Sequence, residues 1–139
     1  MRTQRYSAIA AVTLGCMIWA ITAFAQSQPL RADIPFEFYV GEKLLPAGTY
    51  TLSPTAHGDA IRISHQKGNE SVFVMAVGYR PNHAMNLNRV TFNRYGNTSF
   101  LSSIYWIGFP NGKQLGTSKI EQQLAQNGST PIPVAILVK

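Results

Sequence analysis

The three histidines are the side chains best suited to hold a metal ion, but their spacing does not form a ligand set. His57 lies in a glycine-containing loop, His65 ends a strand-like run and His83 lies in a long polar stretch. A zinc site needs three or four converging ligands, commonly including a closely spaced pair. No pair here has such spacing, so we expect exposed histidines and no metal site.

The carboxylates could perform acid–base chemistry, for which a glycosidase needs two carboxyl groups about 5–10 Å apart. They are Asp33, Glu37, Glu42, Asp59, Glu70 and Glu121. Glu37 and Glu42 flank one turn and we expect them to be solvated, whereas Glu121 follows Ser118 at the spacing of a reciprocal capping box. The chain has no Gly-x-Ser-x-Gly elbow, phosphate-binding loop or dinucleotide fingerprint. We predict no catalytic residue and no cofactor, with a small hydrolase of dispersed site as an alternative.

Aromatic side chains near strand ends and turns are our candidate binding residues, because exposed rings stack on sugars and anchor protein contacts. Arg94 joins them as a possible anion-binding group, and the set is Tyr79, Arg94, Tyr95, Tyr105, Trp106 and Phe109. For Trp106 we favour a core position together with its alternating neighbours Ile104 and Phe100. Tyr105 points opposite to Trp106, so one of the two should face outward. For Arg94 we favour a cation–π or turn contact.

Residues 1–25 have the order of a secretory signal peptide. Two arginines precede an apolar run over residues 8–24, which ends in Ala23-Phe24-Ala25 before Gln26. We expect cleavage after Ala25. A retained membrane anchor and a lipoprotein signal at Cys16 are alternatives, although Thr13 stands where a lipoprotein signal has an aliphatic residue.

The chain that remains after cleavage has no cysteine, so an apolar core must hold it without disulfides. Its ten basic residues outnumber the six acidic ones and give a net charge near +4. The basic residues are scattered along the chain. Nucleic-acid binders concentrate charge on one face, so we expect no nucleic-acid partner.

Period-two alternation of apolar residues predicts a β domain over residues 26–139, with a short polar leader and a C-terminal tail. The expected strands cover residues 33–40, 49–52, 60–64, 71–79, 88–95 and 98–106. The run at 71–79 is almost wholly apolar and indicates a central strand. One short helix is expected over 119–126, and residues 133–138 form a last strand or a loose tail. The fold class is all-β, a small antiparallel β-sandwich or open barrel of six to eight strands with one short C-terminal helix.

Three segments resemble a family of short exported proteins from acidobacteria. The first is the opening from Ile34 to Tyr50, and the others are Phe92-Asn93-Arg94-Tyr95-Gly96 with Phe100-Leu101-Ser102, and Ser118-Lys119-Ile120-Glu121. The resemblance covers most of residues 32–125, although the family helix usually ends in a more charged run. It implies export and a shared β fold, and it implies no activity and no site residues.

These observations favour an exported, periplasmic or secreted, non-enzymatic domain that binds a partner or belongs to the cell envelope. The partner would be a protein or a glycan. A lipocalin-like or carbohydrate-binding carrier of a small ligand is an alternative, and exposed strand edges could pair copies into a homo-oligomer. No stable membrane span is expected after signal cleavage.

Overall fold

The computed structural model describes residues 28–83, 85–107 and 111–138, and the predicted signal segment lies outside them. The described residues form one helix, α1 (Lys119–Gln126), and ten strands. The strands are β1 (Leu30–Ile34), β2 (Phe38–Val40), β3 (Lys43–Leu45), β4 (Gly48–Pro54), β5 (Ala60–His65), β6 (Ser71–Tyr79), β7 (Asn88–Tyr95), β8 (Thr98–Tyr105), β9 (Gly112–Leu115) and β10 (Ile132–Val138). The all-β prediction with one short helix is confirmed. Ten strands exceed the six to eight expected, because short strands form in segments assigned to turns.

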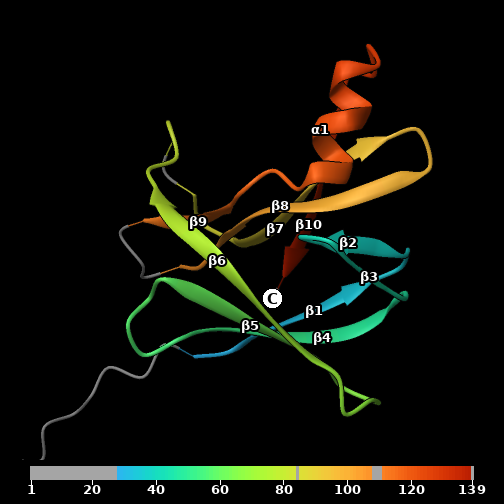
Figure 1. Cartoon of the computed structure of the whole chain (residues 1–139). Helices are drawn as coiled ribbons and strands as arrows, with labels where there is room; N and C mark the ends of the chain where they lie inside the picture. Colours follow the sequence, from blue (N-terminus) through green and yellow to red (C-terminus); the bar gives the residue numbers. More distant parts are fainter. Residues whose placement is uncertain (1–27, 84, 108–110, 139) are drawn as a thin grey trace, which may run out of the picture.

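Eight strands follow one another in antiparallel order, β1-β4-β5-β6-β9-β8-β7-β10. In the described residues β10 approaches β1 without a ladder between them, so the ring is an open barrel. Figure 1 shows it flattened into two layers, with β1, β4 and β5 opposite β7, β8 and β9. The first half of β6 pairs with β5 and its second half with β9, so this strand joins the layers. The β2–β3 hairpin adds to the edge of β8, with β2 parallel to it.

The space between the layers is filled by apolar side chains. Phe38, Tyr50 and Phe92 are at most 1% exposed. The ring of Phe38 meets the rings of Tyr50 and Phe92 edge to face, with centroids 5.1 and 5.3 Å away. Each buried ring contributes about 1.5–3 kcal/mol through its transfer from water. Alternation along the expected strands at 33–40 and 88–95 places Phe36, Phe38, Val90 and Phe92 on inward faces; the last three lie in the core, and Phe36 packs against it partly buried.

The run predicted as one strand over residues 33–40 is divided at Pro35. Its first part, β1, ends at Ile34 and pairs with β4, whereas β2 begins at Phe38 and pairs with β3 and β8. Proline has no N–H to donate to a ladder, so pairing ends there. The alternation continues across the break because both strands face the same core.

A β-bulge at Ser102 changes the side of the sheet to which the side chains at the start of β8 point. Thr91 pairs with Ser103 and Phe92 pairs with Leu101, which leaves Ser102 as the extra residue. Phe100 and Ile104 are both buried, as expected, but they face opposite sides of the sheet. Ile104 belongs to the central core, whereas Phe100 lies outside that cluster.

The helix begins at the predicted residue, and Ser118 Oγ accepts the backbone N–H of Glu121 at 3.1 Å. The predicted reciprocal bond from the Glu121 side chain is wrong. Its carboxylate turns to the sheet and accepts hydrogen bonds from β7 instead. The helix projects from the body (Figure 1), and the chain then returns as β10, so residues 132–138 form a strand. Within the described ranges, no helix has the length and apolar character that a membrane span requires.

Candidate functional site

The candidate residues chosen from the sequence fall into two groups at opposite ends of β8. Arg94 and Tyr95 end β7 directly before the β7–β8 turn, whereas Tyr105 and Trp106 lie at the far end of β8, about 20 Å away at 3.3 Å per residue. Tyr79, at the end of β6, pairs with Gly112 of β9. Phe109 lies outside the described residues. These side chains therefore do not line one site.

Trp106 is 4% exposed and belongs to the central core, as we favoured. Tyr105 lies on the opposite side of the strand and is half-buried. The ring of Tyr79 covers Gly112 so closely that a Cβ there would meet ring carbon Cε1 at 2.4 Å. The positions of Trp106 and Tyr79 are structural, because Trp106 packs in the core and the Tyr79 ring covers the backbone of a neighbouring strand.

Tyr95 belongs to a buried polar cluster beneath the helix. Its hydroxyl donates to Glu121 Oε1 at 3.2 Å, and Asn93 Nδ2 donates to the same oxygen at 2.9 Å. Burial raises the pKa of Tyr95, and the charge of Glu121 and the hydrogen bond to it raise it further. Because Tyr95 is 8% exposed and Glu121 5%, this cluster fixes the helix to the sheet and leaves little room for a ligand.

Arg94 lies on the other side of β7, where its guanidinium carbon is 4.6 Å from the centroid of the Phe36 ring. Its Nε donates to Ser99 Oγ at 3.2 Å. The cation–π contact that we favoured is therefore present. Through this bond Arg94 also orients Ser99, which lines a hollow on the adjacent surface.

The histidines and the remaining carboxylates do not assemble a metal site: in the part of the chain that the structure describes, no three His, Cys, Asp or Glu side chains could hold an ion. The His65 ring lies 4.9 Å from that of Tyr50 and covers Gly48. Glu42 Oε1 accepts the backbone N–H of Lys119 at 2.8 Å and so caps the helix. Glu37 contributes instead to the hollow.

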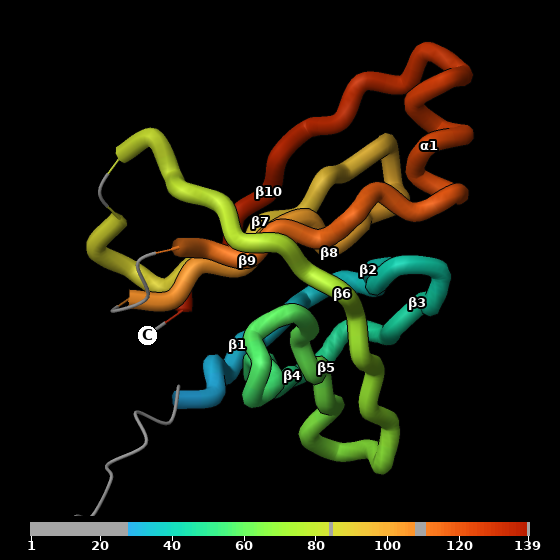
Figure 2. The backbone as a smooth tube through the Cα atoms, turned by 60° about the vertical axis from the view of Figure 1, so that its left-hand side comes forward, coloured from blue at the N-terminus to red at the C-terminus, as the bar shows by residue number. Residues whose placement is uncertain are grey.

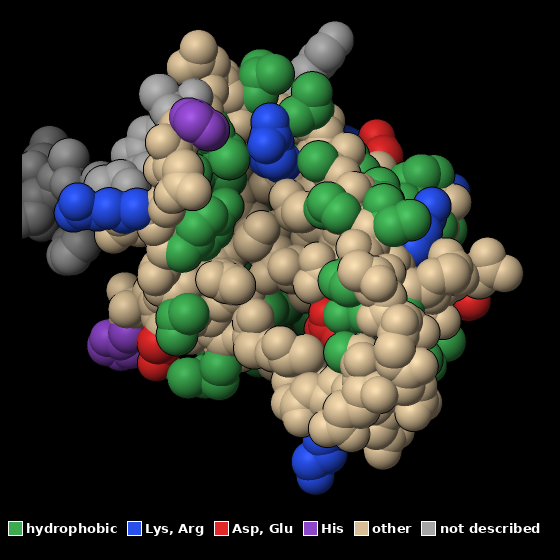
Figure 3. Space-filling model, turned by 90° about the horizontal axis from the view of Figure 1, so that it is seen from above, with side chains coloured by type: hydrophobic (Ala, Val, Ile, Leu, Met, Phe, Trp, Pro, Cys, Tyr) green, Lys and Arg blue, Asp and Glu red, His purple; other side chains and the backbone are tan. Residues whose placement is uncertain are grey.

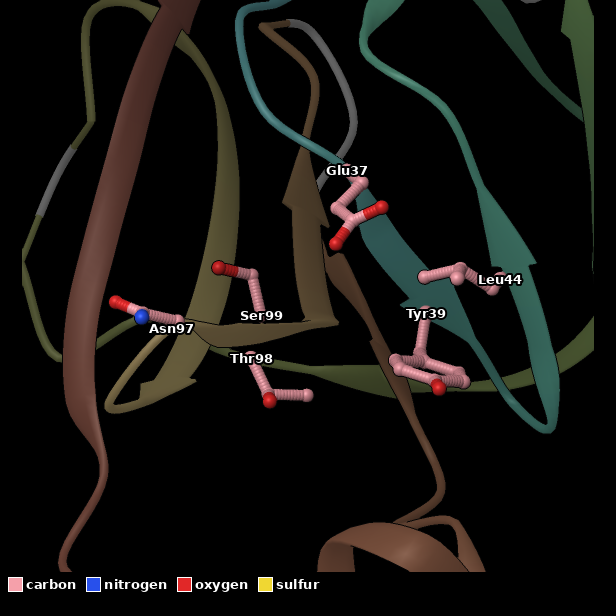
Figure 4. Close-up of a pocket in the computed structure, with 6 residues that line it drawn as sticks. All are labelled: Glu37, Tyr39, Leu44, Asn97, Thr98 and Ser99. Carbon is pink, nitrogen blue, oxygen red and sulfur yellow. The ribbon is translucent and has the colours of Figure 1, made fainter.

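The hollow lies where the β2–β3 hairpin meets the β7–β8 turn. Figure 4 shows its lining residues, Glu37, Tyr39, Leu44, Asn97, Thr98 and Ser99. Its volume is about 90 Å³, and it is open to solvent on one side. Two segments that are some sixty residues apart in the sequence meet here because β2 adds to the edge of β8, pairing Tyr39 with Phe100.

The turn that supplies Asn97 depends on Gly96, which has a φ of +60°. A positive φ at the first turn residue gives the tight hairpin that glycine permits. The turn places Asn97 at the surface, while Thr98 and Ser99 open β8 beside it. The sharp reversal therefore brings three consecutive polar residues to the hollow, although the side chains of Thr98 and Ser99 point to opposite sides of β8 (Figure 4).

The polar groups of the hollow retain hydrogen-bonding capacity. Among the described residues, no partner is present for the Glu37 carboxylate, the Asn97 amide or the Thr98 hydroxyl. Together they offer acceptors, two amide donors and a hydroxyl that serves as either. Such a set can bind a ligand that carries several neighbouring hydroxyl or amide groups.

The opposite wall is apolar and rigid. The Tyr39 ring stacks on the Phe100 ring, with centroids 5.1 Å apart and an angle of 20° between the planes. Tyr95 meets the same Phe100 ring edge to face at 5.8 Å. Leu44 stands beside Tyr39 and is 46% exposed. The fixed ring and the exposed leucine provide a small apolar surface next to the polar wall.

Sequence reasoning missed this hollow, although part of its signal was present. Outward-facing positions of the 33–40 run include Glu37 and Tyr39, and Asn97 lies in a predicted turn. Nothing in the sequence shows that these segments meet, because that contact depends on the break at Pro35 and the parallel addition of β2 to β8.

Lys and Arg side chains stand apart from one another on the face drawn in Figure 3, between polar and hydrophobic groups. A continuous basic stripe of the kind that follows a nucleic-acid backbone is not seen on this face. Comparisons add no relative: no protein-family model, curated protein or solved structure matches the chain.

Proposed function

We propose that this chain is an exported, non-enzymatic binding domain that holds one sugar residue of a glycan in the hollow. The observation that carries the proposal is that Glu37, Asn97 and Thr98, whose polar groups have no partner among the described residues, line one hollow with the stacked ring of Tyr39. A sugar presents hydroxyl groups on its rim and apolar C–H groups on its faces. Both kinds of surface have a counterpart here.

The hollow is small, so it suits contact with one side of a single sugar ring rather than enclosure of the ring. Its volume of about 90 Å³ is well below that of sites that enclose a whole small-molecule ligand. Because one side is open, a longer glycan chain could continue into solvent while a single residue is bound. The hollow is too small and too polar for a large apolar ligand.

A lipocalin-like carrier receives less support. In such a carrier the ligand occupies the barrel interior, whereas here Phe38, Tyr50 and Phe92 fill the space between the layers. A glycosidase also receives less support, because Glu37 is the one carboxylate among the residues that line the hollow. Hydrolysis requires a second carboxyl group across the bond. Binding without cleavage is the function that this geometry favours.

The test is a titration of the ¹⁵N-labelled chain with methyl glycosides of glucose, galactose and N-acetylglucosamine, followed by NMR. We expect one of them to shift the amide signals of Tyr39, Thr98 and Ser99 at millimolar concentrations. Glu37→Gln replaces a charge-assisted hydrogen bond by a neutral one, so affinity should fall about five- to ten-fold. Tyr39→Ala should abolish binding through loss of the stacking surface.

Glu70→Gln is the matched control, because it removes the same charge from an exposed turn residue outside the hollow. It should leave the affinity unchanged. Signals around the hollow that stay fixed with all three sugars, or an equal loss of affinity in Glu70→Gln, would overturn the proposal. Release of free sugar from an oligosaccharide would show that the domain is an enzyme instead.

A further inference from the structure

The outer face of β6 exposes three large apolar side chains in a row. Phe73, Met75 and Val77 are 64%, 67% and 68% exposed, and they alternate along one strand. The sequence predicts this strand to be central, and it does lie between β5 and β9. Its inner face contacts the core through Val72, Val74 and Ala76. Burial in the core therefore does not explain why these three outward positions carry apolar side chains.

These three residues form a convex surface, which we name the β6 ridge (Phe73, Met75 and Val77). The strand passes from one layer to the other, pairing first with β5 and then with β9. Figure 2 shows this course, from the hairpin with β5 to the other layer. A strand shared by two layers lies at their corner, so its outward side chains stand on an edge rather than on a flat sheet.

The strands around the ridge carry no negative charge, and the two acidic residues that directly precede β5 and β6 have partners: Asp59 accepts a hydrogen bond from Thr55, and Glu70 pairs with Lys43. The sequences of β5, β6, β8 and β9 have no Asp or Glu. The guanidinium carbon of Arg62 lies 5.9 Å from the centroid of the Phe73 ring. Its Nη2 reaches Ser71 Oγ at 3.4 Å, and among the described residues no carboxylate lies within ion-pair distance of it. The ridge therefore combines apolar groups with an unneutralised cation.

A second copy of the chain fits the ridge poorly. Two convex edges touch along a line, and three side chains offer far less than the roughly 800 Å² that each partner buries in a stable interface. A soft apolar layer with negative charge at its surface fits better, because it deforms around a ridge and needs no matching shape. An anionic lipid bilayer has these properties.

We propose that the β6 ridge docks the domain on the surface of an anionic lipid bilayer. Phe73, Met75 and Val77 enter the boundary between the headgroups and the acyl chains, and Arg62 stays at the level of the lipid phosphates. The docking is peripheral and reversible, since a single short ridge buries little apolar area. It would hold the domain at a membrane while the hollow, on the β2–β3 hairpin and the β7–β8 turn, binds its own ligand.

The test is sedimentation of residues 26–139 with vesicles of phosphatidylcholine alone or mixed with phosphatidylglycerol. We expect binding to the mixed vesicles and weaker binding as salt is raised. Arg62→Gln should lower the partition coefficient about five-fold. The triple variant Phe73→Ser, Met75→Ser, Val77→Thr should lower it more than ten-fold.

A Phe73→Trp variant reports insertion directly, because its emission should shift to the blue with phosphatidylglycerol vesicles and stay unshifted with pure phosphatidylcholine. Tyr39→Ala, which affects the sugar hollow, should bind vesicles like the unchanged chain, so the two proposals fail separately. Equal binding by the triple variant, or no blue shift, would overturn the inference. If the unchanged chain is a dimer in solution and the triple variant is a monomer, the ridge would be assigned to self-association instead.

Discussion

Replacing Tyr95 by phenylalanine tests the buried cluster that holds the helix to the barrel. The change removes one hydroxyl and keeps the ring, which meets Phe100 edge to face at 5.8 Å. Glu121 Oε1 then retains one of its two donors, from Asn93 at 2.9 Å. Because Glu121 is 5% exposed, solvent can replace the lost bond only in part.

The expected cost follows from the kind of bond that is lost. A hydrogen bond to a charged group contributes about 1.5–3 kcal/mol, and the free energy of unfolding should fall by that amount. For a domain of this size the melting temperature should fall by roughly 5–12 °C. Packing should change little, since the ring remains in place.

The pH dependence supplies a second, independent readout. Burial raises the pKa of Tyr95 above its ordinary value of 10.0, and the Glu121 charge and the hydrogen bond add to the rise. A raised pKa means that the contribution of this group is complete below pH 10 and is lost as pH rises through the folded-state pKa. The difference in stability between the unchanged chain and Tyr95→Phe should therefore be constant below pH 10 and shrink above it.

Urea unfolding at a series of pH values between neutrality and strong alkali measures this difference. Tyr50 also has a pKa raised by burial, with a smaller contribution from the charge of Glu70. Tyr50 is present in both proteins, so its contribution cancels in the difference in stability. Tyr105→Phe is the matched control, because this half-buried tyrosine lies outside the cluster. Equal stability of Tyr95→Phe and the unchanged chain, or a difference that persists unchanged in alkali, would refute the assignment.

Two further predictions concern the sheet. Gly112→Ala places a Cβ 2.4 Å from ring carbon Cε1 of Tyr79 and should cost about 1–3 kcal/mol in urea unfolding, whereas Gly116→Ala, with nothing within 4 Å, should be neutral. Deleting Ser102 removes the bulge, turns Phe100 to the other face and should cost about 3–5 kcal/mol. Ser102→Ala should stay within about 0.5 kcal/mol of the unchanged chain, and equal stability of the deletion and this control would contradict the role given to the bulge.

Strands with regular alternation and short turns could be predicted closely from the sequence. The β7–β8 hairpin and the helix after Ser118 lie where the pattern places them. Both depend on neighbouring residues, since a tight turn and a helix cap are made within a few positions of the chain. The almost wholly apolar run of β6 also predicts a central strand correctly. It does not predict that one face of this strand remains exposed at the surface.

The sequence by itself determined the all-β class, the position of the main hairpin and its turn, and the apolar face of most strands. Only the tertiary structure decided that Pro35 divides a strand between two layers, that Ser102 reverses a face, and that Glu37 meets Asn97 in a hollow. Side-chain alternation is a local property of the extended chain. The pairing of strand edges depends on the free energy of contacts between residues that are distant in the sequence. A short sequence pattern does not contain that information.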